Sequence, residues 1–294
     1  MSGMRFRTVY GSLILCGIAL LIVLDQVLFN QSRPLGSSLL AVLAALAWGE
    51  FARMSGIRGA GPKASRALDF LGLSSVAYFF AVAFLSERGL LSGTGEPWMV
   101  LGITLLVLCA FSIVILRPEF ERYYLSLLET VVAAVILGLL FSYVLRIYHF
   151  PGWRGPVLGA IFIAGVKGND TAAYYVGKAW GRRSLLKVSP RKTLEGSLGA
   201  LVFSSVYFMA AAGIVEWFRP KSLFPWWGGM LFGMMISLVS QIGDLAESLI
   251  KRVYQVKDSG SLLPEFGGVL DMIDSLLFTG FFFWAGVQMA RQGG

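Results

Sequence analysis

Charged and hydroxyl side chains recur at helical spacing in one stretch of the C-terminal half of the chain, formed by Asp244, Glu247, Ser248, Lys251 and Arg252. Spacings of three and four residues place all but Arg252 on neighbouring turns of one helix face. Such a face cannot point at lipid, and carboxylates beside cations could bind a metal ion together with phosphate. The same residues could also form buried ion pairs that only hold helices together. Both interpretations stay open on spacing alone.

A second pair of carboxylates lies near the end of the chain. Asp271 and Asp274 are three residues apart, so a helix points both the same way. Gly267 and Gly268 precede them and allow the backbone to turn tightly and to approach a ligand. Acidic residues are also common in the first turn of a helix, where they favour the helix dipole. The pair could therefore bind a ligand or only stabilise a helix start.

Residues 189–196 combine cations, hydroxyls and a carboxylate just before an apolar run. Arg191 can bind phosphate through two hydrogen bonds, and Lys192 acts as a point charge. Ser189 and Thr193 add hydroxyls and Glu195 adds a carboxylate, and we expect all five residues to bind substrate. These features predict a phosphate-binding turn. In the alternative interpretation, Thr193 and Glu195 start the next helix and the cations are ordinary basic residues of a cytoplasmic loop.

Three more charged residues complete the set. Asp170 follows Asn169 inside a predicted membrane segment, where a carboxylate is costly unless it meets a cation. Lys257 and Asp258 lie in a polar loop further on. We expect Asp170 and Asp258 to contribute to substrate binding and Lys257 to contact phosphate.

Most of the candidate metal ligands among these residues are carboxylate and hydroxyl oxygens. The chain has one histidine, His149, and its two cysteines, Cys16 and Cys109, lie in apolar runs without metal-ligand spacing. Sites rich in oxygen and without His or Cys suit Mg²⁺, which usually shares its coordination shell with phosphates. Carboxylates together with Lys and Arg therefore predict phosphoryl or nucleotidyl transfer.

The overall composition predicts that membrane-spanning helices position these candidate site residues. Hydrophobic residues make up 56% of the chain and charged residues only 14%, against about 25% charged in soluble domains. We therefore expect an all-α polytopic integral membrane protein. A spanning helix needs about 20 mostly apolar residues. Nine segments are suitable, near 9–29, 35–52, 67–85, 98–116, 125–145, 156–177, 198–218, 226–250 and 274–290.

The distribution of charge predicts a domain division and a topology. Since the polar residues concentrate in the C-terminal half, we expect residues 1–150 to form an N-terminal transmembrane helix bundle. We expect residues 151–294 to form a catalytic membrane domain with a polar cavity that faces the cytoplasm. Lysines and arginines concentrate in alternate loops, which places the N-terminus inside and the C-terminus outside. The net charge of +8 then reflects basic loops beside anionic lipid, and no nucleic acid is expected as a partner.

Residues 248–274 resemble the signature of phosphatidate cytidylyltransferases, also called CDP-diacylglycerol synthases. The matching pieces are Ser248, Lys251-Arg252, Lys257-Asp258-Ser259-Gly260, Leu263-Pro264, Gly267-Gly268-Val269, Asp271 and Ile273-Asp274. An upstream stretch is similar to the same family, with Asp170-Thr171, Ala173-Tyr174, Gly177, Gly181 and residues 189–196. The resemblance covers about residues 165–278, and its many fixed spacings make it specific.

The resemblance implies that the chain makes CDP-diacylglycerol and pyrophosphate from CTP and phosphatidate. Asp244 and Asp271 match the family's metal ligands for Mg²⁺, with a second cation such as K⁺, and Asp274 supports the metal site. Lys251, Arg252 and Lys257 would bind triphosphate or lipid phosphate. The resemblance also implies a homodimer in a bacterial-type inner membrane, with the active site on the cytoplasmic side.

Two positions depart from the family pattern, and three alternatives remain. Phe266 stands where the family usually has His, and Met272 where it usually has Arg. The loss of a donor and a cation beside a phosphate site could weaken binding of CTP or lipid, or mark a divergent paralogue. The alternatives are a CTP-dependent kinase of a polyprenol or phytol lipid, a catalytically impaired homologue, and a transporter whose charged residues line an ion path.

Overall fold

The computed structural model is built almost entirely from helices. It describes Gly17 and residues 20–29, 32–57, 63–91, 95–117, 120–151, 154–186, 188–218, 226–261 and 267–292. These residues group into two compact units by their contacts. The first unit comprises Met1–Pro156 with Asp258–Met272, and the second comprises Val157–Lys257 with Ile273–Gly294.

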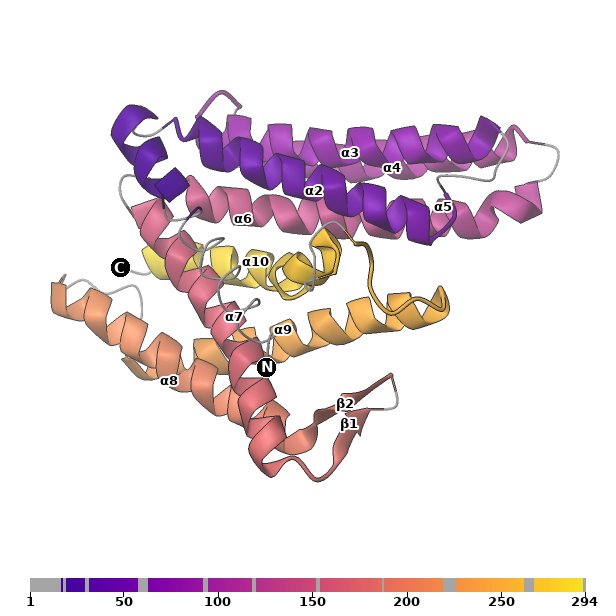
Figure 1. The fold of residues 1–294 in the computed structure, drawn as a ribbon. Helices are drawn as coiled ribbons and strands as arrows, with labels where there is room; N and C mark the ends of the chain where they lie inside the picture. Colours follow the sequence, from indigo (N-terminus) through magenta and orange to yellow (C-terminus); the bar gives the residue numbers. More distant parts are fainter. Residues whose placement is uncertain are drawn as a thin grey trace. The chain divides into compact units, whose positions relative to one another are not determined.

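The first unit is a helix bundle (Figure 1). Its elements are α2 (Pro34–Met54), α3 (Lys63–Glu87), α4 (Glu96–Ile115), α5 (Phe120–Ala134), the π-helix η1 (Val135–Leu140) and α6 (Phe141–Tyr148). The last three run on without a break, and α3 packs against all the others. Large apolar side chains such as Trp48, Phe79 and Phe141 are fully buried between these helices. Trp48 also donates its ring N–H to Asp69 of α3 at 2.8 Å.

The second unit joins helices to a small hairpin. Its elements are α7 (Arg154–Trp180), β1 (Ser184–Leu186), β2 (Ser189–Thr193), α8 (Leu194–Phe218), α9 (Trp226–Val253) and most of α10 (Val269–Gln292). The two strands pair antiparallel, with Ser184 opposite Thr193 and Leu186 opposite Ser189. The hairpin packs on α8 and α9. Figure 1 shows it between the end of α7 and the start of α8. It leads directly into α8 and brings Lys192 to Asp244 of α9.

Apolar helices long enough to cross a membrane account for most of the described chain. Seven qualify: Pro34–Met54, Arg66–Glu87, Glu96–Ile115, Tyr123–Tyr148, Leu194–Ile214, Trp227–Val253 and Val269–Ala290. The predicted class, an all-α polytopic membrane protein, is thereby confirmed. All nine predicted segments overlap helices, with the first described over Leu20–Phe29 and the sixth inside the more polar α7. The count of nine spans and the side of the N-terminus stay predictions.

Glycines bring α9 into close contact with α8. A Cβ atom on Gly233 would overlap the backbone of Ser204, and one on Gly229 would lie 2.7 Å from the carbonyl oxygen of Phe208. Small residues four apart let membrane helices approach closely, because packing rather than water exclusion holds such helices together. This contact fixes α9, which carries Asp244, against α8.

We predict that Gly233→Ala lowers the free energy of unfolding by about 1–3 kcal/mol, because the added methyl group overpacks the contact between α8 and α9. The control is Gly213→Ala on α8, where a Cβ atom would meet nothing within 4 Å. Thermal unfolding in detergent measures both variants. A Gly233→Ala protein as stable as the Gly213→Ala protein would contradict the close approach.

Candidate functional site

A cavity of about 410 Å³ lies in the second unit, between α7, the hairpin, α8 and α9. Six residues predicted to form the site line it: Asp170, Ser189, Arg191, Lys192, Thr193 and Asp244. Tyr174, Lys178, Ser197 and Gln241 complete much of the remaining wall. The structure therefore brings together side chains that are up to 74 positions apart in the sequence, from Asp170 to Asp244.

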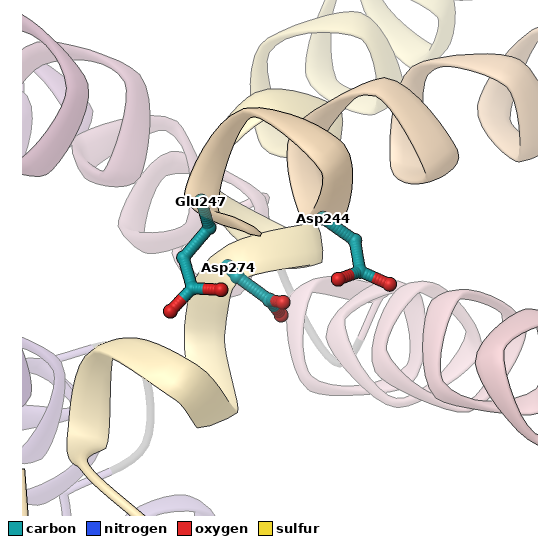
Figure 2. A group of neighbouring side chains, drawn as sticks. All are labelled: Asp244, Glu247 and Asp274. Carbon is teal, nitrogen blue, oxygen red and sulfur yellow. The ribbon is translucent and has the colours of Figure 1, made fainter. Parts of the chain in front are cut away.

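Three carboxylates meet at one edge of this site. Asp244 and Glu247 project from α9 toward Asp274 of α10, and one oxygen of each lies within 4.8 Å of the others (Figure 2). Glu247 and Asp274 are buried, and Asp244 is half-buried. Like charges so close repel each other in a low dielectric, so the group needs cations for neutralisation.

Lysines supply much of that neutralisation. Lys192 from β2 forms an ion pair with Asp244. Lys251 reaches back one turn along α9 to Glu247, with 2.6 Å between the ammonium nitrogen and the carboxylate oxygen. Such a cation offsets part of the cost of burying the carboxylate, and losing it would leave a buried charge without compensation.

Lys167 of α7 forms the third part of this charge network. Its ammonium group lies 3.5 Å from a carboxylate oxygen of Asp170 and 3.7 Å from one of Asp274. It also donates to the hydroxyl of Ser275 at 2.8 Å, and that hydroxyl donates to Asp170 at 3.0 Å. One cation thus bridges α7 and α10 within the second unit.

A buried amide holds the walls of the cavity together. Asn169 is fully buried on α7, and its carbonyl oxygen accepts hydrogen bonds from Ser204 of α8 at 2.9 Å and Ser237 of α9 at 2.6 Å. Its NH₂ group donates to Ser240 of α9 at 3.4 Å. Hydrogen bonds between helices satisfy these polar groups where lipid could not. Asn169 therefore fixes three helices around the neighbouring Asp170.

Residues of the hairpin and the start of α8 stabilise the local backbone as well as line the cavity. Thr193 accepts a hydrogen bond from the N–H of Gly196 at 3.1 Å and so caps α8. The carboxylate of Glu195 accepts from the backbone N–H groups of Arg182 at 3.0 Å and Arg183 at 3.4 Å. This is the helix start that the alternative interpretation expected for Thr193 and Glu195, and it aims Arg191 and Lys192 at the cavity.

Asp271 lies in the first turn of α10, within the first unit. One of its carboxylate oxygens accepts from the N–H of Ser259 at 2.9 Å, the hydroxyl of Ser259 at 3.0 Å and the N–H of Gly268 at 2.8 Å. Gly267 has a φ of 86°, and a Cβ atom there would lie 2.6 Å from that oxygen. Gly267 and Gly268 thus shape the seat of the Asp271 carboxylate. A metal shared by Asp244 and Asp271 stays a prediction, because the two belong to different units.

The other predicted residues lie in and beside the loop after α9. Arg252, Lys257 and Asp258 are exposed, and their contacts with phosphate stay predictions. Met272 is half-buried in α10. Phe266 lies outside the described residues.

Sequence reasoning missed two charged residues that the structure places in networks. They are Lys167 of α7 and Glu50 of α2, and neither belongs to the predicted site. Glu247 belongs to the predicted charged cluster but not to the predicted site residues. One signal could have identified all three, since an ionisable group in an apolar helix needs a partner or a function.

Comparison with known proteins gives a consistent result. A model of the cytidylyltransferase family matches residues 6–290. The chain is 38% identical over 154 residues to the phosphatidate cytidylyltransferase of Bacillus subtilis, which covers 50% of this chain and 53% of that protein. It is 32% identical over 233 residues to that of Staphylococcus aureus, covering 72% of this chain and 84% of that protein.

A plant relative matches over a shorter region. The chain is 43% identical over 126 residues to the chloroplastic phosphatidate cytidylyltransferase 4 of Arabidopsis thaliana, covering 43% of this chain and 31% of that protein. The match thus spans about a third to a half of the length of the plant and Bacillus proteins.

We predict that Lys167→Met lowers the free energy of unfolding by about 1–2 kcal/mol, because Asp170 and Asp274 lose the cation that lies near both. The loss stays moderate because solvent partly screens these ion pairs. Adding Asp170→Asn should recover part of this loss. The control is Lys178→Met, an exposed lysine of the same helix. Thermal unfolding in detergent measures all three, and equal losses for the two lysine variants would contradict the bridging role.

Proposed function

Because the chain belongs to the cytidylyltransferase family, we propose that it transfers the cytidylyl group of CTP to phosphatidate, forming CDP-diacylglycerol and pyrophosphate. The observation that carries this proposal is the cavity of the second unit. Arg191, Lys192, Asp170 and Asp244 line it together, and Lys192 forms an ion pair with Asp244. Cations and carboxylates that line one cavity of a membrane protein suit substrates that carry phosphate and bind a divalent metal ion.

The reaction needs little covalent help from the protein. An oxygen of the phosphatidate phosphate forms a bond to the α-phosphorus of CTP. The bond from that phosphorus to the oxygen bridging the β-phosphate breaks, and its electron pair leaves with pyrophosphate. Since the attacking phosphate is already anionic, the chain must position the two substrates and neutralise their charge rather than abstract a proton.

The basic residues of the cavity are suited to that task. Arg191 can bind a phosphate group through two parallel hydrogen bonds, and Lys192 can move between Asp244 and a phosphate oxygen on its flexible side chain. Ser189 adds a hydroxyl donor in the same wall. Lys251, Arg252 and Lys257 would add positive charge along the end of α9 and the following loop.

The acids fit a hard metal ion. Asp244, Glu247 and Asp274 offer three oxygen ligands that lie within 4.8 Å of one another, a donor set that suits Mg²⁺. We propose that Asp244 holds Mg²⁺, that Asp271 is the second ligand as the family resemblance implies, and that Asp274 supports the site. A bound Mg²⁺ would neutralise the charge that develops on the leaving pyrophosphate. A second cation such as K⁺ is part of the same proposal.

The proposal also includes the side of the membrane on which the site lies and the oligomeric state of the protein. The loops near 178–197 and 251–273 are rich in Lys and Arg, which supports a site on the cytoplasmic side of the membrane. The homodimer rests on the family resemblance, and mass measurement in a defined detergent tests it.

We predict that the purified protein, given CTP, phosphatidate and Mg²⁺, releases pyrophosphate and forms CDP-diacylglycerol. Asp244→Asn and Asp271→Asn should each lower the rate at least about 100-fold, because each removes a charged metal ligand. Asp69→Asn in α3 is the control, since it removes a carboxylate of the first unit while keeping an oxygen for Trp48. Release of CDP without pyrophosphate would instead indicate a lipid kinase.

We predict that EDTA abolishes the activity and that added Mg²⁺ or Mn²⁺ restores it, because hard oxygen ligands bind both ions. Stopped assays with matched free-metal concentrations measure the effect. Activity that persists in EDTA after extensive dialysis would contradict metal dependence.

A further inference from the structure

A carboxylate of the N-terminal half lies in an unexpected place. Glu50 is 2% exposed, four residues before the end of α2, a helix apolar enough to cross a membrane. The adjacent Ala47, Trp48 and Ala52 are fully buried. A charged group at such a position is costly, so the contacts that compensate it indicate its role.

Glu50 accepts hydrogen bonds from the start of α10. Its Oε1 accepts from the N–H of Val269 at 3.0 Å, and its Oε2 accepts from the N–H of Leu270 at 2.9 Å. These are the first two residues of α10, whose N–H groups have no acceptor within their own helix. A residue more than 200 positions away in the sequence therefore caps the helix that carries Asp271.

A shared hydroxyl connects Glu50 to Asp271. The Oγ of Ser259 lies 3.2 Å from Oε2 of Glu50 and 3.0 Å from Oδ2 of Asp271. The N–H of Ser259 donates to the same Asp271 oxygen at 2.9 Å. The loop at Ser259 and the start of α10 are thus held together by two carboxylates at once.

Glycines leave room for this arrangement. A Cβ atom on Gly260 would lie 2.5 Å from Oε1 of Glu50, and one on Gly268 would overlap both Oε2 of Glu50 and the hydroxyl of Ser259. The space that a side chain would fill at either position is where the Glu50 carboxylate lies. Both glycines belong to the segment that resembles the family signature. Their lack of a side chain leaves the space in that segment that the Glu50 carboxylate of α2 fills.

We propose that Glu50 is a positioning residue for Asp271: it fixes the start of α10 and, through Ser259, the orientation of the Asp271 carboxylate. This inference rests on the proposed function, in which Asp271 is a metal ligand. Groups that hydrogen-bond metal ligands set the orientation of those ligands, and their loss typically lowers metal affinity or activity about 10- to 100-fold. The N-terminal bundle then contributes directly to the geometry of the Asp271 carboxylate.

Amide hydrogen exchange of the full-length protein in detergent tests the contact itself. In Glu50→Gln, one amide oxygen remains but an NH₂ group faces a backbone donor. Exchange at Val269 and Leu270 should therefore become at least about tenfold faster, as expected for local opening. Overlapping peptides across residues 258–276 resolve the effect. Asp69→Asn is the matched control, and unchanged exchange in Glu50→Gln would overturn the contact.

Mn²⁺ affinity, measured by electron paramagnetic resonance, tests the consequence. Glu50→Gln should weaken Mn²⁺ binding about 10- to 100-fold and raise the Mg²⁺ concentration for half-maximal activity by a similar factor, with Asp69→Asn unchanged. A wild-type Mn²⁺ affinity in Glu50→Gln would overturn the proposal. If the wild-type protein makes no CDP-diacylglycerol but Glu50→Gln still weakens Mn²⁺ binding, only the proposed function fails.

A second variant covers the case in which Glu50→Gln does not fold. Ser259→Ala removes the shared hydroxyl but keeps the backbone N–H that donates to Asp271. It should weaken Mn²⁺ binding about threefold to tenfold, at the low end of the effect expected for a hydrogen-bond partner of a ligand. Wild-type Mn²⁺ affinity in Ser259→Ala would show that the link from Glu50 does not act on Asp271.

Discussion

A carboxylate among membrane-spanning helices must be neutralised by a nearby cation or by hydrogen-bond donors, and this constraint organises both units of the protein. In the second unit, Asp244 contacts Lys192, Glu247 contacts Lys251, and Asp274 contacts Lys167. These pairs come from α7, the hairpin, α9 and α10, so the charges also decide which elements lie together around the cavity. Polar residues that would be costly in lipid thereby line one cavity, which is the arrangement that the proposed binding of phosphate and metal requires.

The first unit meets the same constraint with backbone donors in place of lysines. Glu50 and Asp271 both accept N–H groups from the segment around the start of α10, and Ser259 contacts each of them. A helix start offers unsatisfied N–H groups and a favourable dipole, so it can neutralise an acid without adding a second charged side chain. This gives the N-terminal bundle a role beyond that of a hydrophobic anchor.

Local patterns predicted much of this architecture, and long-range contacts did not follow from them. Apolar segment length located the helices, because a membrane span has a characteristic length and composition. Spacing placed Asp244 and Glu247 on one face, and Arg191 and Lys192 beside a helix start. The contact of Glu50 with Val269 joins residues 219 positions apart, and no local pattern encodes it. The π-helix η1 inside a predicted span was equally invisible, since apolarity does not distinguish helix types.

The fate of the phosphates of CTP tests the central claim most directly. The protein would be incubated with phosphatidate, Mg²⁺ and CTP carrying radioactive phosphorus at either the α- or the γ-phosphate, and the lipids would be separated by thin-layer chromatography. Cytidylyl transfer predicts label in a lipid product from α-labelled CTP only, and none with Asp244→Asn. Label in lipid from γ-labelled CTP, or undiminished α-label transfer by Asp244→Asn, would contradict the account.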